Sequence, residues 1–237
     1  MSTGHIVASY DEELAQLHRT ITDMGRLAST QLSRALKATL ERDGDLAAAV
    51  MADDALVDAL ENQIENQTLK LLALRAPVGR DLREVVAALK IANNLERIGD
   101  FAANVAKRSL ALNQMPEVEL TRSLRRIGDA ANDMLTRVVT AYADADAAAA
   151  LAVREADNEV DLAYTALFRE LLTYMMEAPQ RITACTHLMF AAKNLERIGD
   201  HATNIAETLC FQVLGQAPDA ERVKGDDTAL TIVTPPA

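Results

Sequence analysis

The 237-residue chain lacks tryptophan, and aromatic residues make up only 3% of it. Its two cysteines, Cys185 and Cys210, form no CxxC pair, so the sequence predicts neither a zinc motif nor a disulfide framework. We expect both to be buried small apolar residues. Hydrophobic residues nevertheless make up 49% of the chain. A core with so few rings has to consist of Leu, Ile, Val, Met and Ala, which favours helices over sheets.

Positive charge is also scarce, since 24 Lys and Arg face 35 Asp and Glu and the net charge is −11. No basic stripe is visible, which argues against a nucleic-acid partner and makes cations the more natural ligands. No stretch approaches the roughly 20 apolar residues of a membrane span. The first residues show no basic region followed by an apolar run, so we expect no secretory signal. These features predict a soluble, cytoplasmic protein.

Proline and glycine divide the chain into six segments. Each segment has apolar residues at spacings of three and four, which predicts an amphipathic helix. The predicted helices span residues 9–41, 46–75, 79–113, 117–142, 147–177 and 180–214. The composition from Gly215 onward is typical of a disordered tail, residues 215–237.

The string NLERIGD occurs at Asn94–Asp100 and again at Asn194–Asp200. The similarity continues beyond it, as NLERIGDFAANVAKR in the first copy and NLERIGDHATNIAET in the second. Such self-similarity indicates a duplicated unit, and long helices joined by short turns pack as antiparallel bundles. The sequence therefore predicts an all-α fold of two tandem antiparallel three-helix bundles related by an internal pseudo-repeat, at residues 1–115 and 116–214.

Each half carries two pairs of acids, and each pair is separated by four positions. That spacing places both carboxylates of a pair on one face of a helix, one turn apart. The midpoint between the two pairs falls at Pro77 in the first half and at Ala178 and Pro179 in the second, so folding each hairpin there brings four carboxylates to the same height. The predicted metal ligands are Asp54, Asp58, Glu96 and Asp100 in the first half, and Asp157, Asp161, Glu196 and Asp200 in the second.

Four crowded carboxylates repel one another unless a positive charge neutralises them. Oxygen-rich sites suit hard divalent cations such as magnesium, manganese or calcium, and also accept iron. Asn104 and Asn204, one turn beyond the second acid, are candidates to add an oxygen or to hold a metal-bound water. The simpler alternative is that the acids make surface ion pairs, for which Arg97 and Arg197 are available. Glu61 and Glu65 are second-tier candidates, and His201 is expected at a surface or interface.

The NLERIGD pattern in a tandem three-helix chain, and especially AAKNLERIGDHATNIAE at residues 191–207, resembles the PhoU family of phosphate-specific transport system accessory proteins. The resemblance implies metal ions at the E/D-x-x-x-D motifs and a homodimeric, non-enzymatic negative regulator of the phosphate-starvation response. It also implies two partners, the ATPase subunit of the phosphate ABC importer and a membrane sensor histidine kinase. Contact with the membrane is expected only through those partners.

Two other functions are compatible with a helical bundle rich in carboxylates. One is a carboxylate-bridged di-iron enzyme, which uses Glu-x-x-His pairs on facing helices. None of His5, His18, His187 and His201 has a glutamate three residues before it, so this alternative is weaker. The other is a purely structural bundle whose acids are solvated.

Overall fold

The computed structural model describes residues 3–216, 218, 225–226 and 228, with side chains from residue 9 onward. Within this part of the chain all regular structure is helical, which confirms the predicted all-α class. The six α-helices are α1 (Thr3–Glu41), α2 (Gly44–Arg75), α3 (Gly79–Leu112), α4 (Ser123–Ala143), α5 (Ala147–Glu177) and α6 (Ile182–Leu214). Two 3-10 turns, η1 (Glu119–Arg122) and η2 (Pro179–Arg181), precede α4 and α6. None of the described helices is long and apolar enough to cross a membrane.

Most predicted boundaries lie within two residues of the observed ones, but the starts of α1 and α4 differ more. Helix α1 begins at Thr3 instead of residue 9, and the sequence signal for this earlier start is weak because Gly4 is a poor helix former. Helix α4 begins at Ser123, six residues later than predicted, because Val118 is extended and η1 fills the interval. Asp43 and Asp146 cap α2 and α5 by accepting backbone N–H bonds, as expected for aspartate at a helix N-terminus.

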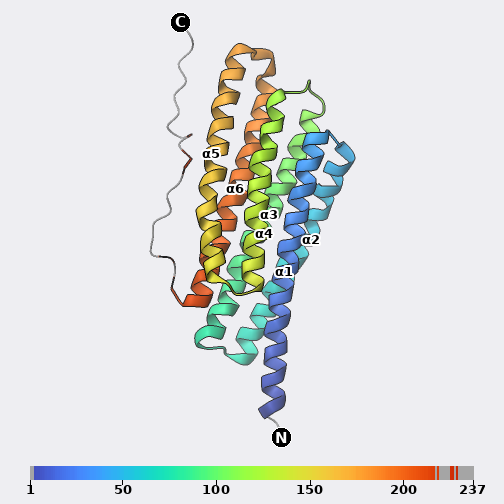
Figure 1. Cartoon of the computed structure of the whole chain (residues 1–237). Coiled ribbons are helices and arrows are strands. Elements are labelled where there is room, and N and C mark those ends of the chain that lie inside the picture. Colours follow the sequence, from blue (N-terminus) through green and yellow to red (C-terminus); the bar gives the residue numbers. More distant parts are fainter. Residues whose placement is uncertain (1–2, 217, 219–224, 227, 229–237) are drawn as a thin grey trace.

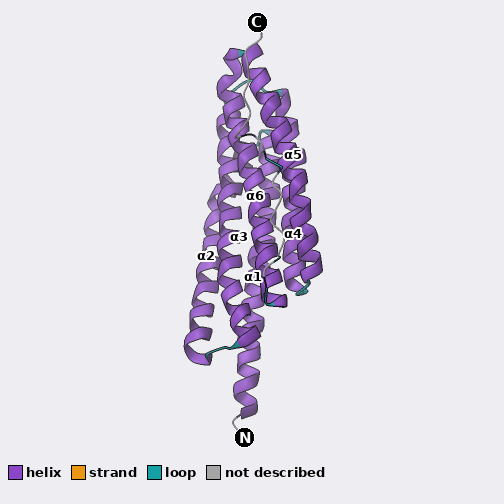
Figure 2. Cartoon of the chain, turned by 90° about the vertical axis from the view of Figure 1, so that its left-hand side faces the viewer, coloured by secondary structure: helices purple, strands orange, loops and turns teal. Residues whose placement is uncertain are grey.

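The helices form two layers. In the larger layer α2 packs on α3, α3 on α6, and α6 on α5, so the four stand side by side in the order α2, α3, α6, α5. Helix α1 packs on α2 and α3, α4 packs on α5 and α6, and α1 and α4 contact each other. The α2–α3 turn lies at one end of the molecule and the α5–α6 turn at the other (Figure 1). A view from the side shows α2 and α5 on opposite flanks (Figure 2).

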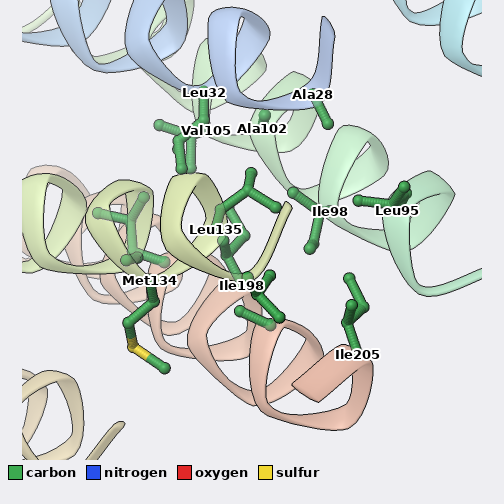
Figure 3. Close-up of a cluster of buried hydrophobic side chains, with 14 of the residues drawn as sticks. Ala28, Leu32, Leu95, Ile98, Ala102, Val105, Met134, Leu135, Ile198 and Ile205 are labelled. Atoms are coloured by element: carbon green, nitrogen blue, oxygen red, sulfur yellow. The ribbon is translucent and has the colours of Figure 1, made fainter. Parts of the chain in front are cut away.

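The two halves share one hydrophobic core. Side chains from α1, α3, α4 and α6 interdigitate between the layers (Figure 3). The residues labelled there are Ala28, Leu32, Leu95, Ile98, Ala102, Val105, Met134, Leu135, Ile198 and Ile205, and all are buried. Cys185 and Cys210 are also buried and free, as predicted. The apolar stripes of the repeated motifs therefore pack against both halves.

Helices α1 and α4 approach closely where each carries a glycine. A Cβ added at Gly25 would overlap Val139, and one added at Gly128 would overlap Leu36. Gly128 lies in the string RRIGD, which resembles the repeated motif but has Arg125 where the acid stands. Its role is to let α4 pack on α1.

The two NLERIGD motifs meet where α3 crosses α6. Phe101 and His201 follow the two copies directly, and their ring centroids are 5.5 Å apart. The Asn94 side-chain oxygen lies 2.8 Å from Nδ1 of His201. His201 is thus an interface residue, and burial lowers its pKa. Equivalent positions of the repeat therefore contact each other across this crossing.

Candidate functional site

The first acid cluster consists of Asp54 and Asp58 on α2 and Glu96 and Asp100 on α3. Asp54 on α2 faces the motif glycine of α3, since a Cβ added at Gly99 would lie 3.4 Å from its Oδ1. Burial raises the pKa of Asp54, a hydrogen bond from Gln31 lowers it, and the charges of Asp100 and Asp58 raise it. The Gln31 amide on α1 donates to Oδ1 of Asp54 at 2.8 Å. The hairpin geometry predicted from the position of Pro77 is therefore present in the fold.

Glu96 has the most perturbed carboxyl group of this cluster. Burial, with smaller contributions from Asp100 and other acids, raises its pKa from 4.5 to about 7. Arg97 offsets part of this, with its guanidinium 3.4 Å from Glu96 and 3.2 Å from Asp100. However, the Arg97 side chain is 52% exposed, so water screens both ion pairs. A cation held among these acids would relieve more of the charge.

The second acid cluster consists of Asp157 and Asp161 on α5 and Glu196 and Asp200 on α6. Asp157, Asp161 and Glu196 are 2%, 1% and 3% exposed, so this cluster lies deeper than the first. Burial raises the pKa of Glu196, Lys193 lowers it, and Asp200 and Asp161 raise it. The Lys193 ammonium lies 2.9 Å from Oε1 of Glu196. The predicted second set of acids is therefore also assembled across its hairpin.

The glycine of each motif makes room for an acid from the facing helix. A Cβ at Gly199 would lie 3.0 Å from Oδ1 of Asp157, and a Cβ at Gly99 would lie 3.4 Å from Oδ1 of Asp54. A side chain at Gly199 would crowd the Asp157 carboxylate, whereas one at Gly99 would crowd Gln31 Oε1 and Val57 Cγ1, both 3.2 Å from the added Cβ, and would just touch Asp54. This explains why the repeated string includes glycine inside a helix, where it costs about 1 kcal/mol relative to alanine.

The donor set fits a hard cation, but the side chains are not arranged around one. Oε1 of Gln31 and Oε2 of Glu196 are buried and lack a hydrogen-bond partner among the described residues, and such oxygens are costly to leave unsatisfied. Yet no three His, Cys, Asp or Glu side chains of the described part of the chain converge on a point that would hold a metal ion. An ion would have to draw the carboxylates of a cluster together.

Other candidate residues have different surroundings. Asn204 donates to Asn94 across the α3–α6 crossing at 3.4 Å, and Asn104 is exposed. Glu61 has a raised pKa, chiefly through burial, and accepts a bond from Asn93. His18 contacts the Tyr142 carbonyl oxygen and His187 contacts Arg108. None of these contacts provides the Glu-x-x-His pairs of a di-iron enzyme.

Sequence reasoning missed several residues that contact the clusters, including Gly225 and Asp226. The predicted disordered tail, residues 215–237, contains these two residues and otherwise lies mostly outside the described part of the chain. Gln31 belongs to α1, outside both hairpins. A single polar residue on an apolar helix face does not indicate which residue it will contact. Lys193 stands one residue before the motif, where the first half has Asn93. Comparison of the two halves at that position would have revealed the difference in charge.

The raised carboxyl pKa values predict a pH dependence of stability. Between pH 4.5 and about 7, Glu96 is protonated in the native state but ionised in the unfolded chain, so stability falls as pH rises through this range. The expected loss in metal-free buffer is about 2 kcal/mol, allowing for the partial exposure of Glu96. Urea unfolding at pH 5 and pH 8 with a chelator would measure it. If the difference in free energy of unfolding between the wild-type chain and Glu96→Gln were the same at pH 5 and pH 8, this explanation would be contradicted.

Two three-helix units with matching carboxylate clusters define a duplicated helical bundle that carries candidate ion sites. The PhoU domain matches the chain twice, at residues 21–109 and 120–209. The chain belongs to the PhoU family.

Relatives and solved structures agree with this assignment. A Caulobacter vibrioides protein named phosphate-specific transport system accessory protein PhoU homolog is 50% identical over 225 residues, covering 94% of this chain and 98% of that protein. The crystal structure of PhoU from Pseudomonas aeruginosa has a TM-score of 0.85 at 36% identity and covers 87% of this chain and 100% of that one. The Streptococcus pneumoniae phosphate transport system regulatory protein PhoU has a TM-score of 0.81 at 30% identity, covering 89% and 100%. The Caulobacter vibrioides protein is named as an accessory protein and the Streptococcus pneumoniae protein as a regulatory protein, in agreement with the prediction of a non-enzymatic protein.

Proposed function

We propose that the chain is a cytoplasmic negative regulator of the phosphate-starvation response. It acts by linking the ATPase subunit of a phosphate ABC importer to a sensor histidine kinase, and it works as a homodimer. The observation that carries this proposal is family membership across both repeats, together with relatives named as accessory proteins of phosphate transport. The absence of any spanning helix among the described ones fits a protein that reaches the membrane through these partners.

Affinity capture would test the proposed partners. The full chain carrying a tag would be purified from phosphate-replete cells of its own organism, and co-purifying proteins would be identified by mass spectrometry. We expect the importer ATPase and a sensor kinase to be recovered. A strain lacking the chain should express its phosphate-starvation genes in phosphate-rich medium. Recovery of neither partner, together with normal repression in that strain, would refute the regulatory role.

We further propose that the two acid clusters bind metal ions, with magnesium, manganese or iron as candidates. The support is chemical: eight carboxylates in two matched sets, raised pKa values in both sets, and buried oxygens without partners. Bound cations would supply the positive charge that these carboxylates lack. Equilibrium dialysis against Mn²⁺, followed by metal analysis, should show bound ions in the wild-type chain. Binding that is unchanged after substitution of Glu96 and Glu196 would exclude these clusters as the site.

A further inference from the structure

Three described residues near the C-terminus lie against the second acid cluster. The backbone N–H of Gly225 donates to Oδ2 of Asp161 at 2.8 Å. Oδ2 of Asp226 lies 2.9 Å from the Lys193 ammonium, which also contacts Glu196. Gly225, Asp226 and Thr228, here called the strap, thus contact both α5 and α6 at the cluster.

The local chemistry of the strap suits this position. A Cβ at Gly225 would lie 2.7 Å from the side-chain oxygen of Asn158 and 3.2 Å from Cβ of Asp161, so glycine permits the close approach to α5. The backbone N–H and the hydroxyl of Thr228 both donate to Oδ1 of Asp226, at 2.9 and 2.6 Å. These bonds hold the Asp226 carboxylate so that its second oxygen faces Lys193.

The strap and Lys193 engage the same oxygens that a cation would need. Oδ2 of Asp161 accepts the Gly225 N–H, and Oε1 of Glu196 faces an ammonium group. A divalent cation ligated by these oxygens would repel Lys193 and would replace the Gly225 N–H at Asp161. Asp226 then loses its ion pair at the cluster, because its partner has moved. Cation binding and docking of the strap therefore depend on the same carboxylate oxygens of Asp161 and Glu196.

We infer that the strap and a divalent cation compete for the second acid cluster, so that cation binding there releases Gly225, Asp226 and Thr228 from α5 and α6. This inference rests on the proposed cation binding and assigns it a consequence. Thermodynamic linkage makes the effect reciprocal. The factor by which a bound cation weakens docking of the strap equals the factor by which a docked strap weakens cation binding. A docked strap therefore lowers the affinity of the second cluster for ions.

The first acid cluster serves as an internal reference. Its position equivalent to Lys193 is Asn93, which is neutral. It also has the buried Gln31, whose Oε1 lacks a hydrogen-bond partner among the described residues. Weakening the strap should leave ion binding at this cluster unchanged.

The test uses the full chain, Mn²⁺ alone as the probe, and two strap variants. Gly225→Pro removes the N–H that bonds Asp161, and Asp226→Asn removes the charge that holds Lys193. Asp129→Asn, an exposed acid on α4, is the matched control. Calorimetric titration measures the Mn²⁺ affinity of each cluster. The binding heat that is lost in Asp161→Asn is the heat of binding at the second cluster. Hydrogen exchange of the Gly225 amide, with and without Mn²⁺, reports strap release directly.

We expect both strap variants to bind Mn²⁺ about tenfold more tightly at the second cluster, within the range of typical coupling between two ligands. The Gly225 amide should exchange faster in wild-type chain saturated with Mn²⁺. Equal second-cluster affinity in wild type and both variants, or exchange unaffected by a bound second ion, would overturn the competition. Binding confined to the first cluster in all chains would overturn it as well, while the proposed cation binding would stand for the first cluster alone. No binding to any chain would overturn both.

Discussion

Replacing Glu96 by glutamine is expected to stabilise the cation-free protein at pH 8 and, at the same time, to weaken Mn²⁺ binding at the first acid cluster by about 100-fold. Burial and neighbouring acids raise the pKa of Glu96 to about 7, so its ionised form at pH 8 opposes folding. Glutamine keeps the shape of the side chain without the charge. The expected gain in free energy of unfolding is about 1 to 2 kcal/mol.

The combination of higher stability and weaker Mn²⁺ binding distinguishes an ion ligand from a residue that only packs. A residue that merely packs would lose stability on substitution, and a solvated surface acid would change neither property. Urea unfolding with a chelator and calorimetry with Mn²⁺ would measure the two effects. Glu117→Gln, at an exposed position before η1, is the matched control and should leave both unchanged. A destabilised Glu96→Gln chain with normal Mn²⁺ affinity would refute the assignment of Glu96 as a ligand.

Replacing Gly199 by valine should cost about 3 kcal/mol of stability and also abolish ion binding at the second cluster. Even a bare Cβ at this position lies 3.0 Å from Oδ1 of Asp157 and 3.4 Å from Cγ1 of Val160. The additional methyl groups have to displace the Asp157 carboxylate or separate α6 from α5. Thermal unfolding and Mn²⁺ titration of the same preparation would measure both changes.

Gly128→Val provides the control for this substitution. Its new side chain would meet Leu36 at the α1–α4 contact, where no cluster acid lies, so it should cost a similar amount of stability and leave the Mn²⁺ stoichiometry of the folded protein intact. If Gly199→Val retained full ion binding at the second cluster, the glycine would serve helix packing alone.

The fold was predictable because its signals are periodic and repeated. Apolar spacing located all six helices, and Pro77 and Pro179 located the turns that bring the acids together. Helix α4 was less predictable at its start, because no sequence signal separates a 3-10 turn from a first α-helical turn. The shared core was not predicted either. An apolar stripe shows that a helix face is buried, but it does not show which neighbour covers that face.

The candidate site was predictable in its carboxylates but not in the groups around them. Spacing along two helices of one hairpin predicted the acids, since all of them obey the same helical period. Gln31 and the strap reach the clusters from a third helix and from the distant C-terminal segment. Contacts of this kind depend on tertiary structure, and no local pattern in one sequence encodes them.

The crossing of α3 and α6 has the form of a symmetric dimer interface within one chain. Phe101 meets His201, its counterpart in the repeat, just as a residue near a twofold axis meets its own copy in a homodimer. In a true homodimer one mutation changes both subunits, whereas in this duplicated chain one mutation changes only one of the two repeats. Covalent fusion therefore allowed Asn93 and Lys193, or Phe101 and His201, to diverge. Lys193 and the strap contact the second acid cluster, whereas the first has the neutral Asn93 at the position of Lys193, and two identical chains around a twofold axis could not carry such a one-sided difference.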